Sequence, residues 1–319
     1  MHCWVIGRGG LLGSSVEKRL ITEHDVWAPL DPIIWKSFDA FQKTFEPALK
    51  DFKEFVGLDP WIILWCAGVG TVSTTADLLN EESLKIEALL LLAKKTFGEL
   101  ISNGTLFFAS SAGGVYAGSA SPPMTESTEV RPLSIYGFQK LRLEETFRRF
   151  GRETGATVLI GRIANLFGPL QDIGKGQGLI TSICLSVVLR RPVKIFVGLE
   201  TIRNYIFSED AAELIVRSLG QLSKFSGGSI VTKIIAARQS HSISSVLMEC
   251  ESVFGHRPLV SISRTGDIRS YPLDLRLESE VFPDVDRFCF TSLAIGIERV
   301  HRSLLESCQV GSLSKVVNY

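Results

Sequence analysis

Residues 5–20 of the chain read VIGRGGLLGSSVEKRL and place a group of glycines between an apolar run and an amphipathic run. Three of these glycines, Gly7, Gly10 and Gly13, have the spacing G-x-x-G-x-x-G. Such a join is typical of a strand that turns sharply into a helix whose free N–H groups point at an anion, usually a phosphate. We therefore expect a dinucleotide-binding turn, and the alternative is a turn with a purely structural role.

Runs rich in β-forming residues then alternate with helical patterns through the first two-thirds of the chain. The runs are CWVIG (3–7), HDVWAPLD (24–31), PWIILWCAG (60–68), TLFFASS (105–111) and ATVLIGRIAN (156–165). This alternation predicts βαβ units and a parallel sheet, and the continuous apolar character of two runs predicts helices on both faces. We expect an α/β fold with a doubly wound, Rossmann-type parallel sheet.

The regular alternation lapses around residues 165–180, where glycine and proline gather. We expect residues 1–168 to form the dinucleotide-binding domain and residues 169–319 to form mainly a smaller C-terminal substrate-binding lobe. A further strand pattern at residues 229–237 predicts that the chain returns to complete the first sheet.

Composition limits the classes of partner and compartment. Lys+Arg and Asp+Glu both count 34 in 319 residues, so neither nucleic acid nor an anionic membrane surface is expected as a partner. The six scattered cysteines indicate a reducing compartment, and the five histidines lack metal-ligand spacing, so we expect no metal. The start of the chain has no signal-peptide pattern and the longest apolar run, residues 88–93, is too short to span a membrane. We expect a cytoplasmic protein.

Two residues near the glycine turn bear on the choice of dinucleotide. Asp31 ends the second predicted strand, where a carboxylate accepts hydrogen bonds from an adenine-ribose 2′-hydroxyl, and this favours NAD over NADP. Asp31 could instead be a turn residue before Pro32. Arg8, inside the glycine turn, could face the 2′-phosphate of NADP.

A second group of residues predicts proton transfer. Tyr136 and Lys140 are four residues apart at the start of a predicted amphipathic helix and therefore share one face. A neighbouring ammonium favours the phenolate form of a tyrosine, so Tyr136 could exchange a proton with a substrate hydroxyl. Ser111 ends a predicted strand, at the sheet edge where open α/β folds bind ligands, and its hydroxyl could hold the same oxygen. Alternatively, Tyr136 packs in the core and Lys140 is solvated.

Taken together, these segments resemble the extended short-chain dehydrogenase/reductase family, in particular its NAD-dependent nucleotide-sugar epimerase/dehydratase branch. The resemblance covers nearly the whole chain. It rests on GRGGLLG (7–13), Asp31, WCAG (65–68), SSAGGVY (110–116), YGFQK (136–140), RIANLFGP (162–169) and RNYIFSEDAA (203–212).

The resemblance implies roles for individual residues. Ser111, Tyr136 and Lys140 would be catalytic, and Ser111, Asn165 and Arg203 would bind a nucleotide-diphosphate sugar. Arg203 suits that task because a guanidinium can bind phosphate oxygens in a bidentate manner, although it could also be a surface cation beside Glu209 or Asp210. The cofactor would contact Gly7, Gly10, Leu11, Leu12, Gly13, Asp31, Ala67, Gly68, Tyr136, Lys140 and Ile163. The family also implies a homodimer formed through two helices.

Two departures from the family pattern narrow the function. Dehydratases and related decarboxylases carry an acidic residue just after the catalytic strand, where this chain has Ala112, Gly113 and Gly114. In many relatives an asparagine supports the active-site lysine, here Lys140, through a water molecule. In this chain Lys85 lies near the position expected for that asparagine, and Asn80 lies too early in the sequence.

The main hypothesis is therefore an NAD-dependent nucleotide-sugar epimerase, most simply at C4, that removes a hydride and returns it. One alternative is an NAD(P)H-dependent reductase of a 4-keto-6-deoxy nucleotide sugar. An alternative of another class is a non-catalytic regulator that senses a dinucleotide.

Overall fold

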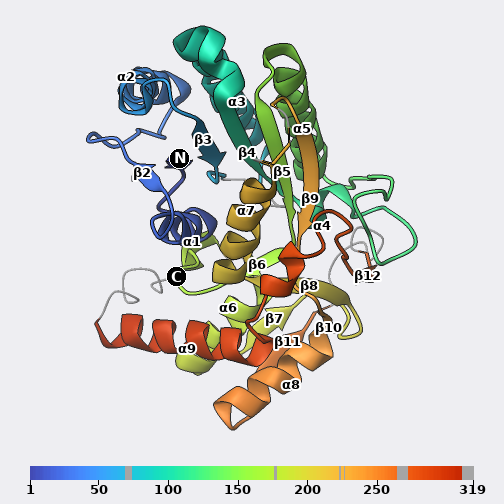
Figure 1. The fold of residues 1–319 in the computed structure, drawn as a ribbon. Coiled ribbons are helices and arrows are strands. Elements are labelled where there is room, and N and C mark those ends of the chain that lie inside the picture. Colours follow the sequence, from blue (N-terminus) through green and yellow to red (C-terminus); the bar gives the residue numbers. More distant parts are fainter. Residues whose placement is uncertain (69–73, 176–177, 223, 226, 264–271, 311–319) are drawn as a thin grey trace.

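A six-stranded, wholly parallel sheet forms the centre of the larger part of the molecule (Figure 1). The computed structural model describes residues 1–68, 74–175, 178–222, 224–225, 227–263 and 272–310. In spatial order the strands are β2 (Asp25–Trp27), β1 (His2–Ile6), β3 (Trp61–Trp65), β4 (Gly104–Ser111), β5 (Thr157–Ile163) and β9 (Ile230–Ile235). The order reverses beside β1, as in a doubly wound sheet, which confirms the predicted fold class.

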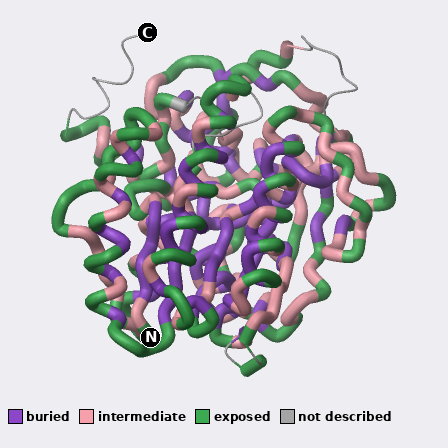
Figure 2. Tube along the Cα trace, turned by 90° about the horizontal axis from the view of Figure 1, so that it is seen from above, coloured by how far each residue is buried: buried purple, intermediate pink, exposed green. Residues whose placement is uncertain are grey.

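Helices cover both faces of this sheet, and the strands bury side chains on each. In β1, Val5 packs into the core shared with α1 (Leu11–Leu20) and α7 (Ser208–Leu222). Its neighbour Trp4 packs into the core shared with α2 (Phe38–Val56), α3 (Ala76–Phe97) and α5 (Ile135–Thr154). Figure 2 shows these buried positions along the central strands and the exposed positions on the surrounding helices. Burial on both faces explains the continuous apolar runs in the sequence.

Local capping residues fix where the functional helix begins and ends. The Ser134 hydroxyl accepts a hydrogen bond from the Gly137 N–H at 3.1 Å, so α5 begins at Ile135 and carries Tyr136 in its first turn. Gly155 ends α5 in the left-handed conformation, with φ of 73°. The sequence alone therefore sets the position of Tyr136 and Lys140 on this helix.

The second, smaller group of elements lies beyond the carboxyl ends of the central strands (Figure 1). Strand β8 (Ile202–Phe207) pairs with β6 (Asn165–Phe167), β10 (Ser240–Ser242) and β12 (Asp274–Leu275). Strand β7 (Val193–Ile195) pairs with β11 (Val260–Ile262). Helices α6 (Leu179–Val188), α8 (Ile243–Phe254) and α9 (Leu293–Gln309) share a core with Phe167 and Phe207. The other helical segments are α4 (Ala112–Val115) and short 3₁₀ helices at Gly98–Asn103, Ile173–Lys175 and Val285–Phe288.

The structure corrects two predicted strand boundaries. Strand β2 ends at Trp27 and not at Asp31, because prolines follow at Pro29 and Pro32 and proline has no N–H for the ladder. The predicted run 156–165 is split, since β5 ends at Ile163 and Asn165 begins a strand of the smaller sheet. The predicted returning strand is β9.

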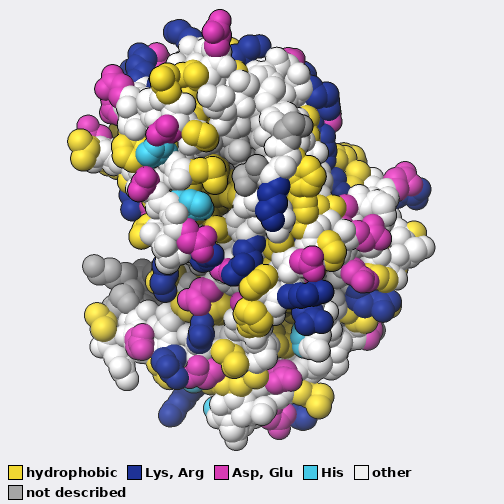
Figure 3. Space-filling model, in the orientation of Figure 1, with side chains coloured by type: hydrophobic (Ala, Val, Ile, Leu, Met, Phe, Trp, Pro, Cys, Tyr) yellow, Lys and Arg dark blue, Asp and Glu magenta, His cyan; other side chains and the backbone are white. Residues whose placement is uncertain are grey.

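The surface carries both signs of charge. On the face drawn in Figure 3, basic and acidic side chains are interspersed, and apolar side chains lie among them. Among the described helices, none combines the length and apolar character needed to cross a bilayer. In the same part of the chain, no cluster of three or more His, Cys, Asp or Glu side chains is placed to hold a metal ion.

Candidate active site

The glycine turn connects β1 to α1 in the geometry that the sequence predicts. Gly7 has φ of +90°, and a Cβ atom built there would lie 2.5 Å from the Ala67 nitrogen at the end of β3. A Cβ atom on Gly13 would lie 2.1 Å from the Gly7 carbonyl oxygen. Gly10 caps α1 without a side chain, so the first N–H groups of the helix stay open to an anion. The turn therefore has the tight bend and the open helix end that a pyrophosphate requires.

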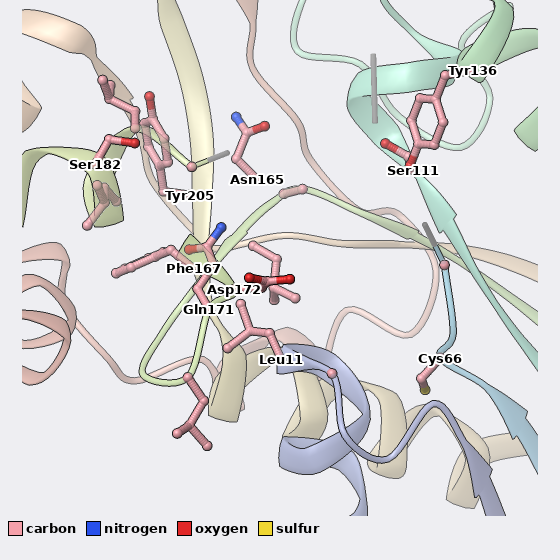
Figure 4. Close-up of a pocket in the computed structure, with 18 of the residues that line it drawn as sticks. Leu11, Cys66, Ser111, Tyr136, Asn165, Phe167, Gln171, Asp172, Ser182 and Tyr205 are labelled. Carbon is pink, nitrogen blue, oxygen red and sulfur yellow. The ribbon is translucent and has the colours of Figure 1, made fainter. Parts of the chain in front are cut away.

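Ser111 and Tyr136 come together at the carboxyl edge of the sheet. Ser111 ends β4, and its Oγ accepts a hydrogen bond from the Gly114 N–H at 3.1 Å. Gly114 in turn makes room for the tyrosine, because a Cβ atom there would lie 3.2 Å from Tyr136 Cε1. Both side chains line the same cavity, which Figure 4 shows in close-up. The small residues after β4 thus leave space for the aromatic ring next to the serine.

Lys140 lies one turn of α5 beyond Tyr136 and is almost completely buried, with 4% of its surface exposed. Its Nζ is 5.7 Å from the centre of the Tyr136 ring. It donates a hydrogen bond to Glu82 Oε1 at 3.0 Å and a longer one, 3.4 Å, to the Ala109 carbonyl. Burial alone would lower the pKa of Lys140, but the charges of Glu82 and Tyr136 outweigh it and raise the pKa. Lys140 is therefore an ammonium held beside Tyr136, and the alternative of a solvated lysine is wrong.

Arg203 and Asn165 approach the cavity from the smaller sheet. Arg203 lies on β8, where its Nη1 donates to the Ile202 carbonyl at 2.8 Å, and burial lowers its pKa. Among the described residues no carboxylate pairs with Arg203, so neither Glu209 nor Asp210 is its partner as the alternative had it. Asn165 begins β6 directly opposite Tyr205 of β8, whose pKa burial raises to about 12. The cavity thus has a half-buried cation that forms no ion pair with a carboxylate among the described residues.

One cavity of about 1130 Å³ joins these groups. The predicted site residues that line it are Gly7, Gly10, Leu11, Ala67, Gly68, Ser111, Tyr136, Asn165 and Arg203. Those that do not line it are Leu12, Gly13, Asp31, Lys140 and Ile163. Lys140 lies just behind the wall, since a Cβ atom on Gly68 would be 4.0 Å from its Nζ. Leu12 is 7% exposed and packs in the core of the sheet.

The residues predicted to select the dinucleotide lie differently from the sequence-based expectation. Asp31 is exposed in the loop that follows β2, and it does not reach the described wall of the cavity. Trp35 and Lys36 of the same loop do line it. Arg8 also stays outside, because its Nε pairs with Glu17 Oε1 on α1 at 3.0 Å. The loop between β2 and α2 therefore contributes to the site through residues that the sequence analysis did not select.

Glu82 is the other functional candidate that sequence reasoning missed. Glu82 contacts Lys140 directly, where many relatives have an asparagine and a water molecule. Lys85, which lies near the position expected for that asparagine, donates to the Trp35 carbonyl at 2.8 Å and pairs with Glu81. A signal was present, because Glu82 lies between Leu79 and Ile86 at helical spacing, on the buried side of α3. A carboxylate on an otherwise apolar face requires a buried partner, and that partner is Lys140.

The comparisons with known proteins agree with this geometry. The model of the NAD dependent epimerase/dehydratase family matches residues 3–231, which include the glycine turn, Ser111, Tyr136, Lys140 and Arg203. The chain belongs to this family.

Individual members of the NAD dependent epimerase/dehydratase family resemble the chain over shorter stretches. It is 31% identical over 125 residues to the dTDP-4-dehydro-6-deoxyglucose reductase of Escherichia coli, which is 39% of each chain. It is 25% identical over 227 residues to the dTDP-L-rhamnose 4-epimerase of Burkholderia thailandensis, 65% of this chain and 60% of that one. These matches thus span less than two thirds of the curated relatives.

A solved structure shows the same fold. The UDP-glucose 4-epimerase of Thermus thermophilus, solved as a complex with NAD, superposes with a TM-score of 0.72 at 19% identity. The superposition covers 95% of this chain and 98% of that one. The fold likeness therefore extends beyond residue 231, into the smaller group of elements.

Proposed function

We propose that the protein is an NAD-dependent nucleotide-sugar epimerase, most simply acting at C4. The observation that carries the proposal is that one cavity is lined by the glycine turn, by Ser111 and Tyr136, and by Arg203. Its volume of about 1130 Å³ exceeds the roughly 300–1,000 Å³ usual for one ligand. A dinucleotide and a nucleotide sugar together require such a space.

The residues at the glycine turn fit a dinucleotide. The open helix end at Gly10 suits the pyrophosphate, and Gly7, Leu11, Ala67 and Gly68 would line its path toward Tyr136. Bound NAD would supply a hydride acceptor next to the sugar. The NAD in the Thermus thermophilus structure and the family description support this cofactor. NADP is less well supported because Arg8 pairs with Glu17 outside the cavity.

Proton transfer and substrate binding would be carried out by the side chains of the protein. The Tyr136 phenolic oxygen takes the proton of the sugar hydroxyl and later returns it, and the Ser111 hydroxyl donates a hydrogen bond to the same sugar oxygen. The Lys140 ammonium, with its Nζ 5.7 Å from the ring centre, favours the phenolate that accepts the proton. Arg203 binds the diphosphate of the substrate, which replaces the missing counter-ion, and Asn165 adds an amide close by.

The residues after β4 argue against a reaction at a second carbon. Ala112, Gly113 and Gly114 have no acidic side chain for dehydration or decarboxylation. With a single proton-transfer group at the sugar, the simplest outcome is oxidation at one carbon followed by reduction of that carbon. This sequence is an epimerisation without net redox change.

A second candidate is reduction of a 4-keto-6-deoxy nucleotide sugar. The observation that favours it is the 31% identity over 125 residues to the Escherichia coli dTDP-4-dehydro-6-deoxyglucose reductase. The third candidate, a non-catalytic dinucleotide sensor, loses its support. That support was the unusual segment around Lys85, and in the structure Lys140 is instead held by Glu82.

The experiment uses UDP- and dTDP-hexoses that carry deuterium at C4. An epimerase that removes and returns one hydride yields the C4 epimer with the label retained, and the total NADH of the solution stays constant. Stoichiometric consumption of NADH or NADPH with a 4-keto-6-deoxy substrate, and no epimer of any labelled hexose, would replace the epimerase proposal with the reductase.

We further propose a homodimer formed through α3 and α5. Leu84 and Leu91 on α3 are 47% and 70% exposed, and Phe138 on α5 is 60% exposed. The two helices are linked at this surface by Arg142 and Glu87, 3.4 Å apart. Light scattering should give twice the mass of the chain, and Leu91→Glu combined with Phe138→Glu should give the monomer. A monomeric wild-type protein would refute the dimer.

The thiols bear on the compartment. All six cysteines are free, which suits a reducing environment such as the cytoplasm.

A further inference from the structure

Glu82 and Lys140 form an almost completely buried ion pair between α3 and α5. Their side chains are 4% and 5% exposed, and Glu82 Oε1 lies 3.0 Å from Lys140 Nζ. Glu82 also lines the cavity, whereas Lys140 lies behind its wall. The other carboxylate oxygen, Oε2, is buried and has no hydrogen-bond partner among the described residues. Within that part of the chain, Lys140 is therefore the only group that compensates the charge of Glu82.

We propose that Glu82 is a positioning residue for proton transfer: it fixes the Lys140 ammonium by direct contact and offsets the positive charge that acts on Tyr136. The inference rests on the proposed role of Tyr136 in the epimerase. In this proposal a carboxylate, Glu82, supports Lys140, and its negative charge changes the electrostatic effect of Lys140 on Tyr136. A neutral supporting group would not have that effect. An ammonium beside a neutral amide acts on the phenol with its full charge, whereas an ammonium beside a carboxylate acts as part of a dipole.

The surroundings of Lys140 contain few other charges. Helix α3 contributes Glu82, and α5 contributes Tyr136 and, one turn beyond Lys140, Glu144. Glu144 is itself neutralised by Arg162, with Nη2 and Oε2 2.8 Å apart. Strand β4 contributes only the Ala109 carbonyl and the Phe108 ring, 5.1 Å from Nζ. Of the two carboxylates in the described part of the chain that act on Lys140, Glu144 is thus paired with a guanidinium and Glu82 is not.

The test measures the ionisation of Tyr136 directly. Tyrosinate absorbance is titrated against pH in the full-length protein, and the Tyr136→Phe variant is subtracted because the chain has five tyrosines. In Glu82→Gln the ammonium acts without the opposing carboxylate, so the midpoint of Tyr136 should fall by about one pH unit. The acid limb of the pH profile of turnover should likewise shift to lower pH. Glu82→Asp keeps the charge and should keep the wild-type midpoint.

Two controls separate this role from a structural one. Glu81→Gln removes a neighbouring carboxylate that also lines the cavity but pairs with Lys85, and it should leave the midpoint unchanged. The double variant Glu82→Gln with Lys140→Met removes both charges, so no lone ion stays buried, and its midpoint should lie well above that of Glu82→Gln alone, because the unopposed ammonium is gone. This variant keeps the test usable if Glu82→Gln folds poorly.

An unchanged or higher midpoint in Glu82→Gln would overturn the proposal, and so would a double variant whose midpoint is as low as that of the single variant. The titration needs no substrate. It therefore separates a failure of this inference from a failure of the epimerase function, which the deuterium-labelled sugars test.

Discussion

Arg162 of β5 binds Glu144 of α5 through two hydrogen bonds, with Nε 3.0 Å from Oε1 and Nη2 2.8 Å from Oε2. Glu144 is fully buried and lies one helical turn beyond Lys140. The Ser110 hydroxyl, next to Ser111, also donates to Glu144 Oε1 at 2.6 Å. These contacts thus fix the helix that carries Tyr136 and Lys140 against β5 and against β4, which carries Ser111.

Glu144→Gln should destabilise the protein strongly. The substitution leaves the Arg162 charge buried without a counter-ion, which costs about 3–5 kcal/mol. Urea unfolding followed by circular dichroism measures this loss. Glu145→Gln is the matched control, because Glu145 is the next residue of α5 and is 59% exposed, so its loss should change stability by less than about 1 kcal/mol. Equal effects of the two variants would show that the buried pair does not anchor the helix.

The same pair predicts a dependence of stability on pH. Burial would raise the pKa of Glu144, but the hydrogen bonds and charge of Arg162 outweigh it and lower the pKa below the usual 4.5. A carboxyl whose folded-state pKa is lowered stabilises the fold above its unfolded pKa, and this stability is lost as the pH falls through the folded value. Wild type should therefore lose stability below about pH 4.5 more steeply than Glu144→Gln. Parallel curves in that range would contradict the assignment.

Gly13→Ala should weaken dinucleotide binding although Gly13 does not line the cavity. A Cβ atom there would lie 2.1 Å from the Gly7 carbonyl oxygen, so the turn must shift and the cost is about 1–3 kcal/mol. Calorimetry should show at least a tenfold lower affinity for NAD. Gly220→Ala in α7, where an added Cβ meets nothing within 4 Å, should leave the affinity unchanged. An affinity for NAD in Gly13→Ala equal to that of wild type would show that the glycine turn is not part of the cofactor site.

Arg203→Met should affect binding and stability in opposite directions. Loss of the charged hydrogen bonds to a diphosphate should weaken nucleoside-diphosphate binding by about 1.5–3 kcal/mol, roughly 10- to 100-fold. The ligand-free protein should become no less stable, because Arg203 is half-buried and has no carboxylate partner among the described residues. Arg276→Met serves as control, since Arg276 is half exposed and pairs with Asp274 at 2.9 Å. Unaltered nucleotide affinity in Arg203→Met would exclude Arg203 from the substrate site.

Arg8→Gln should leave the preference between NADH and NADPH within about twofold of wild type. Its guanidinium pairs with Glu17 and does not line the cavity, so a 2′-phosphate would not lose a contact. Dissociation constants for both dinucleotides measure the ratio. A selective loss of NADPH binding would restore Arg8 as the selecting residue and favour the reductase.

Much of the site follows from local sequence patterns. Gly7 and Gly13 lie in one turn, and Ser111 ends a strand. Tyr136 and Lys140 lie on one face of α5, the helix whose N-terminus Ser134 caps. Each of these relations spans a few residues, and spacing alone therefore predicts it. The doubly wound sheet follows equally from the alternating pattern.

The remaining features depend on contacts between distant segments. Glu82 meets Lys140 only because α3 packs against α5, and no spacing within either helix reveals the pair. Asp31 suited a strand end, but β2 stops at Trp27, and the loop turns Trp35 and Lys36 toward the cavity instead. Local propensity could not show either result, because tertiary packing decides both.

The measurement that tests the central claim most directly is the mass of the dinucleotide released when freshly purified protein is denatured without added cofactor. An epimerase recovers its own hydride and gains from retaining the carrier, so the account predicts about one NAD per chain. Protein that is empty, or that releases or prefers NADPH, would contradict it and favour the ketosugar reductase.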